Sequence, residues 1–188
     1  MYGVLLKRCC DVLVCVLLLV LLSPLLLLVA IAIRIEDGGP PIFRQQRVGR
    51  AGAPFTIYKF RSMPVGTPNM PSVAAGGLRV TRVGRVLRRT NIDELPQLWN
   101  VLKGDMSLVG PRPALPSQTA LLALREAAGV VSLRPGLTGL AQVNAYDGMP
   151  ETEKVQWEDR YARRVSFGSD LSILLRTFVY LLRRPPSY

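Results

Sequence analysis

The sequence predicts an α+β protein: an N-terminal re-entrant, kinked membrane helix and a mainly helical domain with a short β-hairpin and interfacial amphipathic helices. Three observations support this fold class. An uncharged apolar run lies near the start of the chain, two short strand-like segments follow it, and most of the remainder has helical periodicity. We expect the membrane segment to cover residues 1–35 and a second domain, the one that would carry any active site, to cover residues 36–188.

The apolar run from Val12 to Ile33 has no charged residue and is long enough to cross a bilayer core of ~30 Å. It is too long for a signal peptide and has no small-residue cleavage site at its end. At its centre, Ser23-Pro24 predicts a kink, because proline lacks a backbone donor and the Ser23 hydroxyl can satisfy a freed carbonyl. Basic residues flank both ends, and such residues prefer the cytoplasm. We therefore favour a re-entrant helix over the alternative, a spanning one.

After a turn signal at residues 36–41, Ile42–Val48 and Phe55–Phe60 read as two strands joined by a loop with Gly and Pro, which predicts a hairpin. Residues 64–77 are rich in Pro, Gly, Ala and Ser and predict a mobile surface loop. Further helices are expected at residues 78–89, 116–128, 151–164 and 171–182.

Two of these helices have alternative interpretations. In residues 78–89 arginines recur every three residues, which gives a helix one basic and one apolar face. That basic face is either a solvated stripe or a surface turned toward an anion or a membrane. The apolar segment 171–182, followed by Arg183-Arg184, fits an interfacial helix lying on the membrane or, as the alternative, a core helix.

The composition narrows the classes of function. Lys and Arg number 24 against 13 Asp and Glu, which gives a net charge of +11 and indicates a polyanionic partner such as nucleic acid, an anionic membrane face or a phosphorylated substrate. The positive mean hydropathy argues against a purely soluble nucleic-acid binder. The chain has no histidine, which excludes Ser-His-Asp and Cys-His nucleophilic sites and His-ligated zinc. Cys9, Cys10 and Cys15 form a poor disulfide framework and read as small apolar residues.

The segment 91–102 carries an acidic pair. Asn91 followed by Glu94 three residues later predicts a helix N-cap with a capping box, and such a helix start could also help to hold a phosphate. This structural role does not account for Asp93 beside Glu94. Adjacent carboxylates suit Mg²⁺, which bridges phosphate oxygens, and a carboxylate can also attack phosphorus. The residues alone leave Asp93 open as either a nucleophile or a metal ligand.

Arginines are the second part of the predicted site, because they can neutralise the charge that phosphate oxygens carry in the transition state. Arg88 lies five residues before Asp93. Arg112 and Arg134 lie in rigid, proline-bounded turns, Pro111-Arg112-Pro113 and Arg134-Pro135-Gly136. We therefore expect a phosphate-handling site.

The segment Asn91–Pro113, NIDELPQLWNVLKGDMSLVGPRP, resembles the signature of the bacterial sugar transferase family. These are monotopic phosphoglycosyl transferases that initiate glycan assembly on undecaprenyl phosphate. The resemblance covers nearly the whole chain, and the chain looks like the minimal catalytic form of the family. Further motifs match in order: Lys7-Arg8 with Asp11, Ser23-Pro24, Tyr58–Met63, Arg134–Gly139, Ala141–Asn144 and Asp170-Leu171.

The resemblance implies a mechanism in which Asp93 attacks the β-phosphate of a UDP-sugar and releases UMP. Undecaprenyl phosphate then accepts the sugar phosphate, with Glu94 assisting and with Mg²⁺ bound by Asp93 and Glu94. Asn91 stands where many members have Ser or Thr, and residues 145–150 depart from the common Gly-Arg, so the sugar stays open. Contacts to phosphate and nucleotide are expected from Lys59, Arg61, Arg88, Arg112, Arg134 and Gln142.

The resemblance also implies a place in the cell: the cytoplasmic leaflet of a bacterial inner membrane, with the catalytic domain facing the cytoplasm. The pathway could be that of O-antigen, capsule, exopolysaccharide or glycoprotein, and a homodimer would fit. Nucleic acid is not an expected partner. The rival interpretations are a membrane-anchored binder of nucleic acid or anionic lipid without catalysis, a phosphatase, and a glycosyltransferase that would release UDP.

Overall fold

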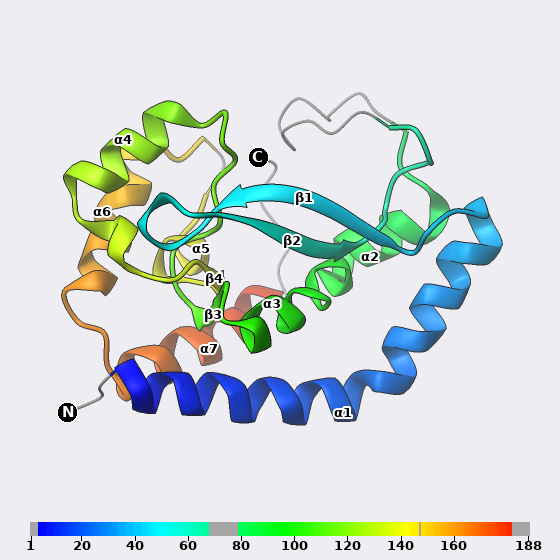
Figure 1. Ribbon diagram of the computed structural model, residues 1–188, viewed down its shortest axis with the longest axis horizontal. Helices are drawn as coiled ribbons and strands as arrows, with labels where there is room; N and C mark the ends of the chain where they lie inside the picture. Colours follow the sequence, from blue (N-terminus) through cyan, green and yellow to red (C-terminus); the bar gives the residue numbers. More distant parts are fainter. Residues whose placement is uncertain (1–3, 68–78, 147, 182–188) are drawn as a thin grey trace.

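The computed structural model describes residues 4–67, 79–146 and 148–181 (Figure 1). It contains one long apolar helix, α1, a β-hairpin, a second small sheet and a set of shorter helices. In Figure 1, α1 lies along one side of the molecule and the hairpin along the other, with α2 and α3 between them. The predicted mixture of helices with a small amount of sheet is confirmed.

Helix α1, Val4–Asp37, continues through Pro24. Proline has no N–H for the carbonyl of Val20, four residues earlier, and the Ser23 hydroxyl donates to that carbonyl instead, at 2.8 Å. Figure 1 shows that the ribbon of α1 changes direction along its length. Large apolar side chains remain exposed along it, among them Leu13 at 72% and Val20 at 69%. By length and composition α1 could cross a membrane, and its exposed apolar surface indicates membrane association.

The hairpin pairs β1, Ile42–Val48, with β2, Pro54–Phe60, in antiparallel register, as the sequence predicts. A second sheet pairs β3, Ser107–Val109, with β4, Gly136–Thr138, in parallel. The sequence did not predict it, because three residues are too few to show strand alternation.

The expected helices form, with shifted ends. Leu78, Leu182, Arg183 and Arg184, together with residues 68–77 of the predicted loop, lie outside the described residues. Of the arginines in the predicted stripe, Arg79 precedes α2. The helices are α2 Arg82–Thr90, α3 Gln97–Lys103, α4 Thr119–Ala127, α5 Leu140–Val143, α6 Glu151–Ala162 and α7 Phe167–Leu181.

Asn91 stands at the N-cap position of a short 3₁₀ turn, but the predicted side-chain cap and capping box do not form. Asn91 adopts a left-handed conformation, with φ 55° and ψ 14°, and its N–H donates to the carbonyl of Arg88. It therefore ends α2, a position that asparagine tolerates well. A single 3₁₀ turn, η3 Ile92–Glu94, follows, and the side chain of Asn91 caps nothing. There is no capping box and no long helix start to hold a phosphate, so Glu94 is available for other partners.

The main core joins α1 to the hairpin and to α3, α6 and α7. Its fully buried members include Cys15, Leu98, Met106 and Ile173. Asn100, also fully buried, donates to the carbonyl of Thr56 at 2.7 Å and accepts from the N–H of Tyr58 at 3.1 Å. This clamp fixes β2 against α3. On α7, Ile173 lies in the core, whereas other apolar residues are exposed: Leu171, Leu175, Phe178 and Val179.

Candidate active site

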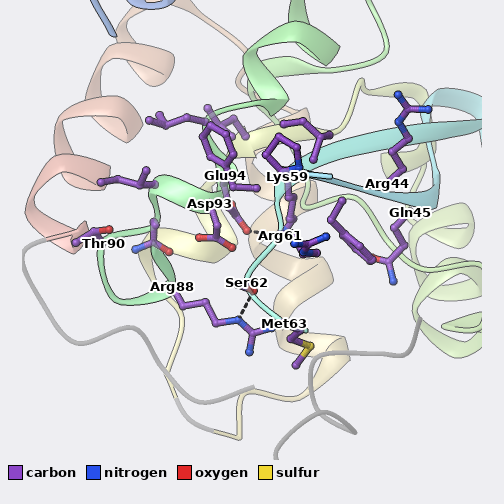
Figure 2. A pocket seen from close by; sticks show the side chains of 18 of the residues that line it. Arg44, Gln45, Lys59, Arg61, Ser62, Met63, Arg88, Thr90, Asp93 and Glu94 are labelled. Atoms are coloured by element: carbon purple, nitrogen blue, oxygen red, sulfur yellow. Dashed lines mark hydrogen bonds and ion pairs between the residues drawn. The ribbon is translucent and has the colours of Figure 1, made fainter. Parts of the chain in front are cut away.

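A large cavity lies where the end of the hairpin meets α2 and the η3 turn. Its volume is about 1160 Å³, and its walls include the predicted residues Lys59, Arg61, Arg88, Asp93, Glu94, Arg112 and Gln142. Figure 2 shows Asp93 and Glu94 next to each other on the η3 turn, with Lys59 from β2 beside Glu94. Seven of the eight predicted catalytic and binding residues are thus brought to one space.

Glu94 is held between two cations. Its Oε1 accepts from Lys59 Nζ at 2.7 Å and from Arg112 Nη2 at 3.0 Å. Burial by itself would raise the pKa of Glu94, but Arg112 and Lys59 outweigh burial and hold the pKa well below its usual range. Glu94 is therefore ionised at any pH at which the protein would work, and it fixes two phosphate-binding cations in place.

Asp93 has a different environment although it is the next residue. Among the described residues, no side chain or backbone group donates a hydrogen bond to its carboxylate or pairs with it. Burial raises the pKa of Asp93 to about 6, with Glu94 adding to the effect while Lys59, Arg88 and Arg112 oppose it. A carboxylate with a raised pKa is more basic than an exposed one and still ionised at pH 7. The two acids therefore separate into a fixed anion and an available one.

Arg88, on α2, and Arg61, directly after β2, also line the cavity. The Nε of Arg88 donates to Ser62 Oγ at 2.9 Å, the contact drawn as a dashed line in Figure 2. The guanidinium of Arg61 pairs with Asp37, at the end of α1, at 3.0 Å, and it packs directly on Gly39. Arg61 therefore ties the end of α1 to the cavity.

Arg112 is positioned by contacts that the sequence analysis missed. The buried side chain of Arg125, on α4, donates to the carbonyl of Arg112 at 2.9 Å and forms a two-point ion pair with Glu158 on α6. These residues lie 33 positions apart, and each belongs to a helix that reads as amphipathic, so no local pattern could have linked them.

The two remaining predicted residues, Gln142 and Arg134, line different cavities. Gln142 lines the cavity, where its Nε2 donates to the carbonyl of Leu137 at 3.3 Å and its buried Oε1 has no hydrogen-bond partner among the described residues. Arg134 does not line this cavity. It donates to the carbonyl of Gly104 at 3.0 Å and lines a second, smaller cavity.

The acidic pair fits a magnesium ion that takes its other ligands from a substrate. The described residues hold no cluster of three or more acidic or cysteine side chains, so a closed protein cage is not formed by them. Mg²⁺ commonly binds through one or two carboxylates together with substrate phosphates and water. The free carboxylate of Asp93 and the Oε2 of Glu94 match that ligand set.

Comparison with known proteins identifies the family of the chain. The family model described as bacterial sugar transferase matches residues 2–184. The UDP-glucose:undecaprenyl-phosphate glucose-1-phosphate transferase of Caulobacter vibrioides is 47% identical over 97% of this chain and 72% of its own length. The enzyme of that name from Klebsiella pneumoniae is 40% identical over 91% of this chain, which spans only 39% of that relative.

A third relative has a different sugar in its name. The UDP-N-acetylgalactosamine-undecaprenyl-phosphate N-acetylgalactosaminephosphotransferase of Aeromonas hydrophila is 39% identical over 94% of this chain and 43% of its own length. The family match covers almost the whole chain and includes every residue of the acidic site. This protein therefore belongs to the bacterial sugar transferase family.

Proposed function

We propose that this protein transfers a sugar-1-phosphate from a UDP-sugar to undecaprenyl phosphate, giving a polyprenyl-diphosphate-sugar and UMP. The observation that carries the proposal is the carboxylate of Asp93, which has no partner among the described residues and lies in a cavity where Glu94 holds Lys59 and Arg112. The names of the relatives support the same class of reaction.

The reaction has two displacement steps at one phosphorus. In the first, a carboxylate oxygen of Asp93 bonds to the β-phosphorus, and the phosphoanhydride bond breaks so that UMP leaves with the electron pair. In the second, an oxygen of undecaprenyl phosphate attacks that phosphorus and the bond to Asp93 breaks, which regenerates the carboxylate. The raised pKa of Asp93 supports its role as nucleophile, because a more basic carboxylate is a stronger one.

The surrounding cations would stabilise the negative charge of the phosphate oxygens in both steps. Lys59, Arg88 and Arg112 lie around the pair and would neutralise the non-bridging phosphate oxygens. Mg²⁺, held by Asp93 and Glu94, would supply further neutralisation of the diphosphate. Gln142, whose buried Oε1 still lacks a donor, would accept a hydrogen bond from the nucleotide or the sugar.

The apolar end of the same cavity suits the lipid substrate. Val14 and Leu18 of α1 and Leu174 of α7 line it together with the acidic pair. We infer that the first isoprene units of the carrier lie against these side chains, which brings the lipid phosphate to the level of Asp93. The exposed apolar faces of α1 and α7 then rest in the membrane.

Contacts at both ends of α1 support re-entrant topology. Near its start, Lys7 pairs with Asp170 of α7 at 2.6 Å. Near its end, Glu36 accepts from the backbone N–H groups of Arg82 and Val83 at the start of α2. Since both ends bind the same domain, we propose that α1 enters and leaves on the cytoplasmic face of the inner membrane, with a kink at Ser23-Pro24. Cysteine labelling that places the N-terminus in the periplasm would overturn this topology.

The test of function is a UMP-release assay with undecaprenyl phosphate, Mg²⁺ and a panel of UDP-sugars. The wild-type protein should release UMP with at least one sugar, and Asp93→Asn should release none while it still binds lipid. Release of UDP would indicate glycosyl transfer instead. Normal turnover by Asp93→Asn, or salt-sensitive binding without any turnover, would refute the proposal.

A further inference from the structure

A second cavity, of about 220 Å³, lies at the start of α1 and collects four basic side chains. Lys7 and Arg8 come from α1, Arg50 from the turn of the hairpin, and Arg134 from the segment before β4. We call it the basic cavity. Among the described residues that line it, Asp11 is the one acid. Three segments distant in the sequence therefore bring cations to one small space.

The acids near the basic cavity are already engaged. Asp11 accepts from Ser107 Oγ at 2.7 Å and lies 3.8 Å from Lys7. Asp170, which does not line the cavity, pairs with Lys7 and accepts from the hydroxyl of Tyr161 at 2.7 Å. The charge of Lys7 is thus neutralised by two carboxylates. The uncompensated positive charge of the basic cavity comes from its three arginines, Arg8, Arg50 and Arg134.

The three arginines bond only to neutral backbone carbonyls within the described part of the chain. Arg8 donates to Val101 and Leu102. Arg50 donates through Nε to Ser132 at 2.9 Å, and Arg134 donates through Nε to Gly104 at 3.0 Å. These bonds fix the guanidinium groups but leave the terminal nitrogens of Arg50 and Arg134 without a protein acceptor in the described residues.

Such an arrangement is unfavourable without an anion. Burial and the nearby charges of Arg50 and Arg8 lower the pKa of Arg134, which reflects the cost of like charges held together. A phosphate oxygen would offset that repulsion, and paired guanidinium nitrogens match phosphate geometry well. The volume far exceeds that of a single water, which is ~30 Å³.

We propose that the basic cavity binds the phosphodiester of an anionic membrane lipid and so anchors the start of α1. The lipid source is favoured because Leu5 and Leu6, in the same turns of α1, are exposed to 79% and 52%. This places the cavity at headgroup level. The inference rests on the membrane placement proposed above but not on the transfer chemistry, and it gives Arg134 a role away from Asp93.

The test is tryptophan-fluorescence melting of the full-length protein in detergent. Short-chain phosphatidylglycerol should raise the melting temperature more than short-chain phosphatidylcholine does. Arg50→Gln/Arg134→Gln should raise the half-saturating phosphatidylglycerol concentration by at least about tenfold. The matched control is Arg85→Gln/Arg89→Gln, which removes the same charge from α2 at residues that line neither described cavity. The control should respond as wild type does.

Arg50→Gln alone keeps the test decisive if the double variant fails to fold, because Arg50 is exposed. Equal responses of the basic-cavity and control variants would overturn the proposal. Stabilisation by inorganic phosphate alone, at matched ionic strength, would overturn the lipid assignment in favour of a soluble phosphate. Because the readout is binding, its failure is separable from a failure of UMP release.

Discussion

The buried ion pair behind Arg112 gives a prediction about stability. In Glu158→Gln the cation of Arg125 loses its charged partner, although both side chains stay buried, at 7% and 2% exposure. The pair has two contacts, at 2.5 and 2.7 Å. Removing one partner of a buried pair costs about 3–5 kcal/mol. For a chain of this size, each kcal/mol shifts the melting temperature by about 2–4 °C, so a fall of roughly 6–20 °C is expected.

Asp159→Asn is the matched control on the same helix. Asp159 pairs with Arg163, whose side chain is 76% exposed, and exposed pairs contribute only about 0–1 kcal/mol. Thermal unfolding followed by tryptophan fluorescence compares the two variants. Because Arg125 also donates to the carbonyl of Arg112, Glu158→Gln should lower kcat/KM for UMP release as well. Equal melting temperatures for the two variants would refute the assignment of a buried, stabilising pair.

Three further predictions concern the acidic site and its support. The kcat/KM for UMP release should fall about tenfold per pH unit below about pH 6 and level off above it, since Asp93 must be ionised to attack; a flat profile from pH 5 to 7.5 would contradict this. Lys59→Met removes a cation that lowers the pKa of Asp93, so the midpoint of that profile should move to higher pH; an unchanged midpoint would argue against this electrostatic effect of Lys59. Gly84→Ala should destabilise the protein by about 1–3 kcal/mol in thermal unfolding, because its Cβ would lie 2.1 Å from the carbonyl oxygen of Ser62, whereas helix propensity alone predicts a gain.

Local patterns were enough to predict the hairpin and most of the helices. Ile42–Val48 and Phe55–Phe60 read as short strands joined by a loop with Gly and Pro, so their pairing needs no information from elsewhere. The long apolar helix was also predicted from the sequence. So was the hydrogen bond from the Ser23 hydroxyl to the carbonyl freed by Pro24. Motif resemblance predicted the acidic pair and five of the residues that line the cavity around it.

The parts that were missed depend on contacts distant in the sequence. Asn91 has the residue type of an N-cap, but its left-handed backbone ends α2 instead. Arg134 lies in a proline-bounded turn like that of Arg112, and only the fold separates the two into different cavities. The Arg125–Glu158 pair joins two helices, each of which reads as an ordinary amphipathic helix by itself.

Whether Asp93 is the nucleophile is the central claim, and trapping the intermediate tests it most directly. The protein is incubated with Mg²⁺ and a UDP-sugar labelled in its β-phosphate, without lipid. We predict label bound covalently to wild-type protein, stoichiometric release of UMP, no label on Asp93→Asn, and loss of the label when undecaprenyl phosphate is added. If wild-type protein turns over with lipid but takes up no label without it, Asp93 is only a metal ligand and the two-step mechanism is wrong.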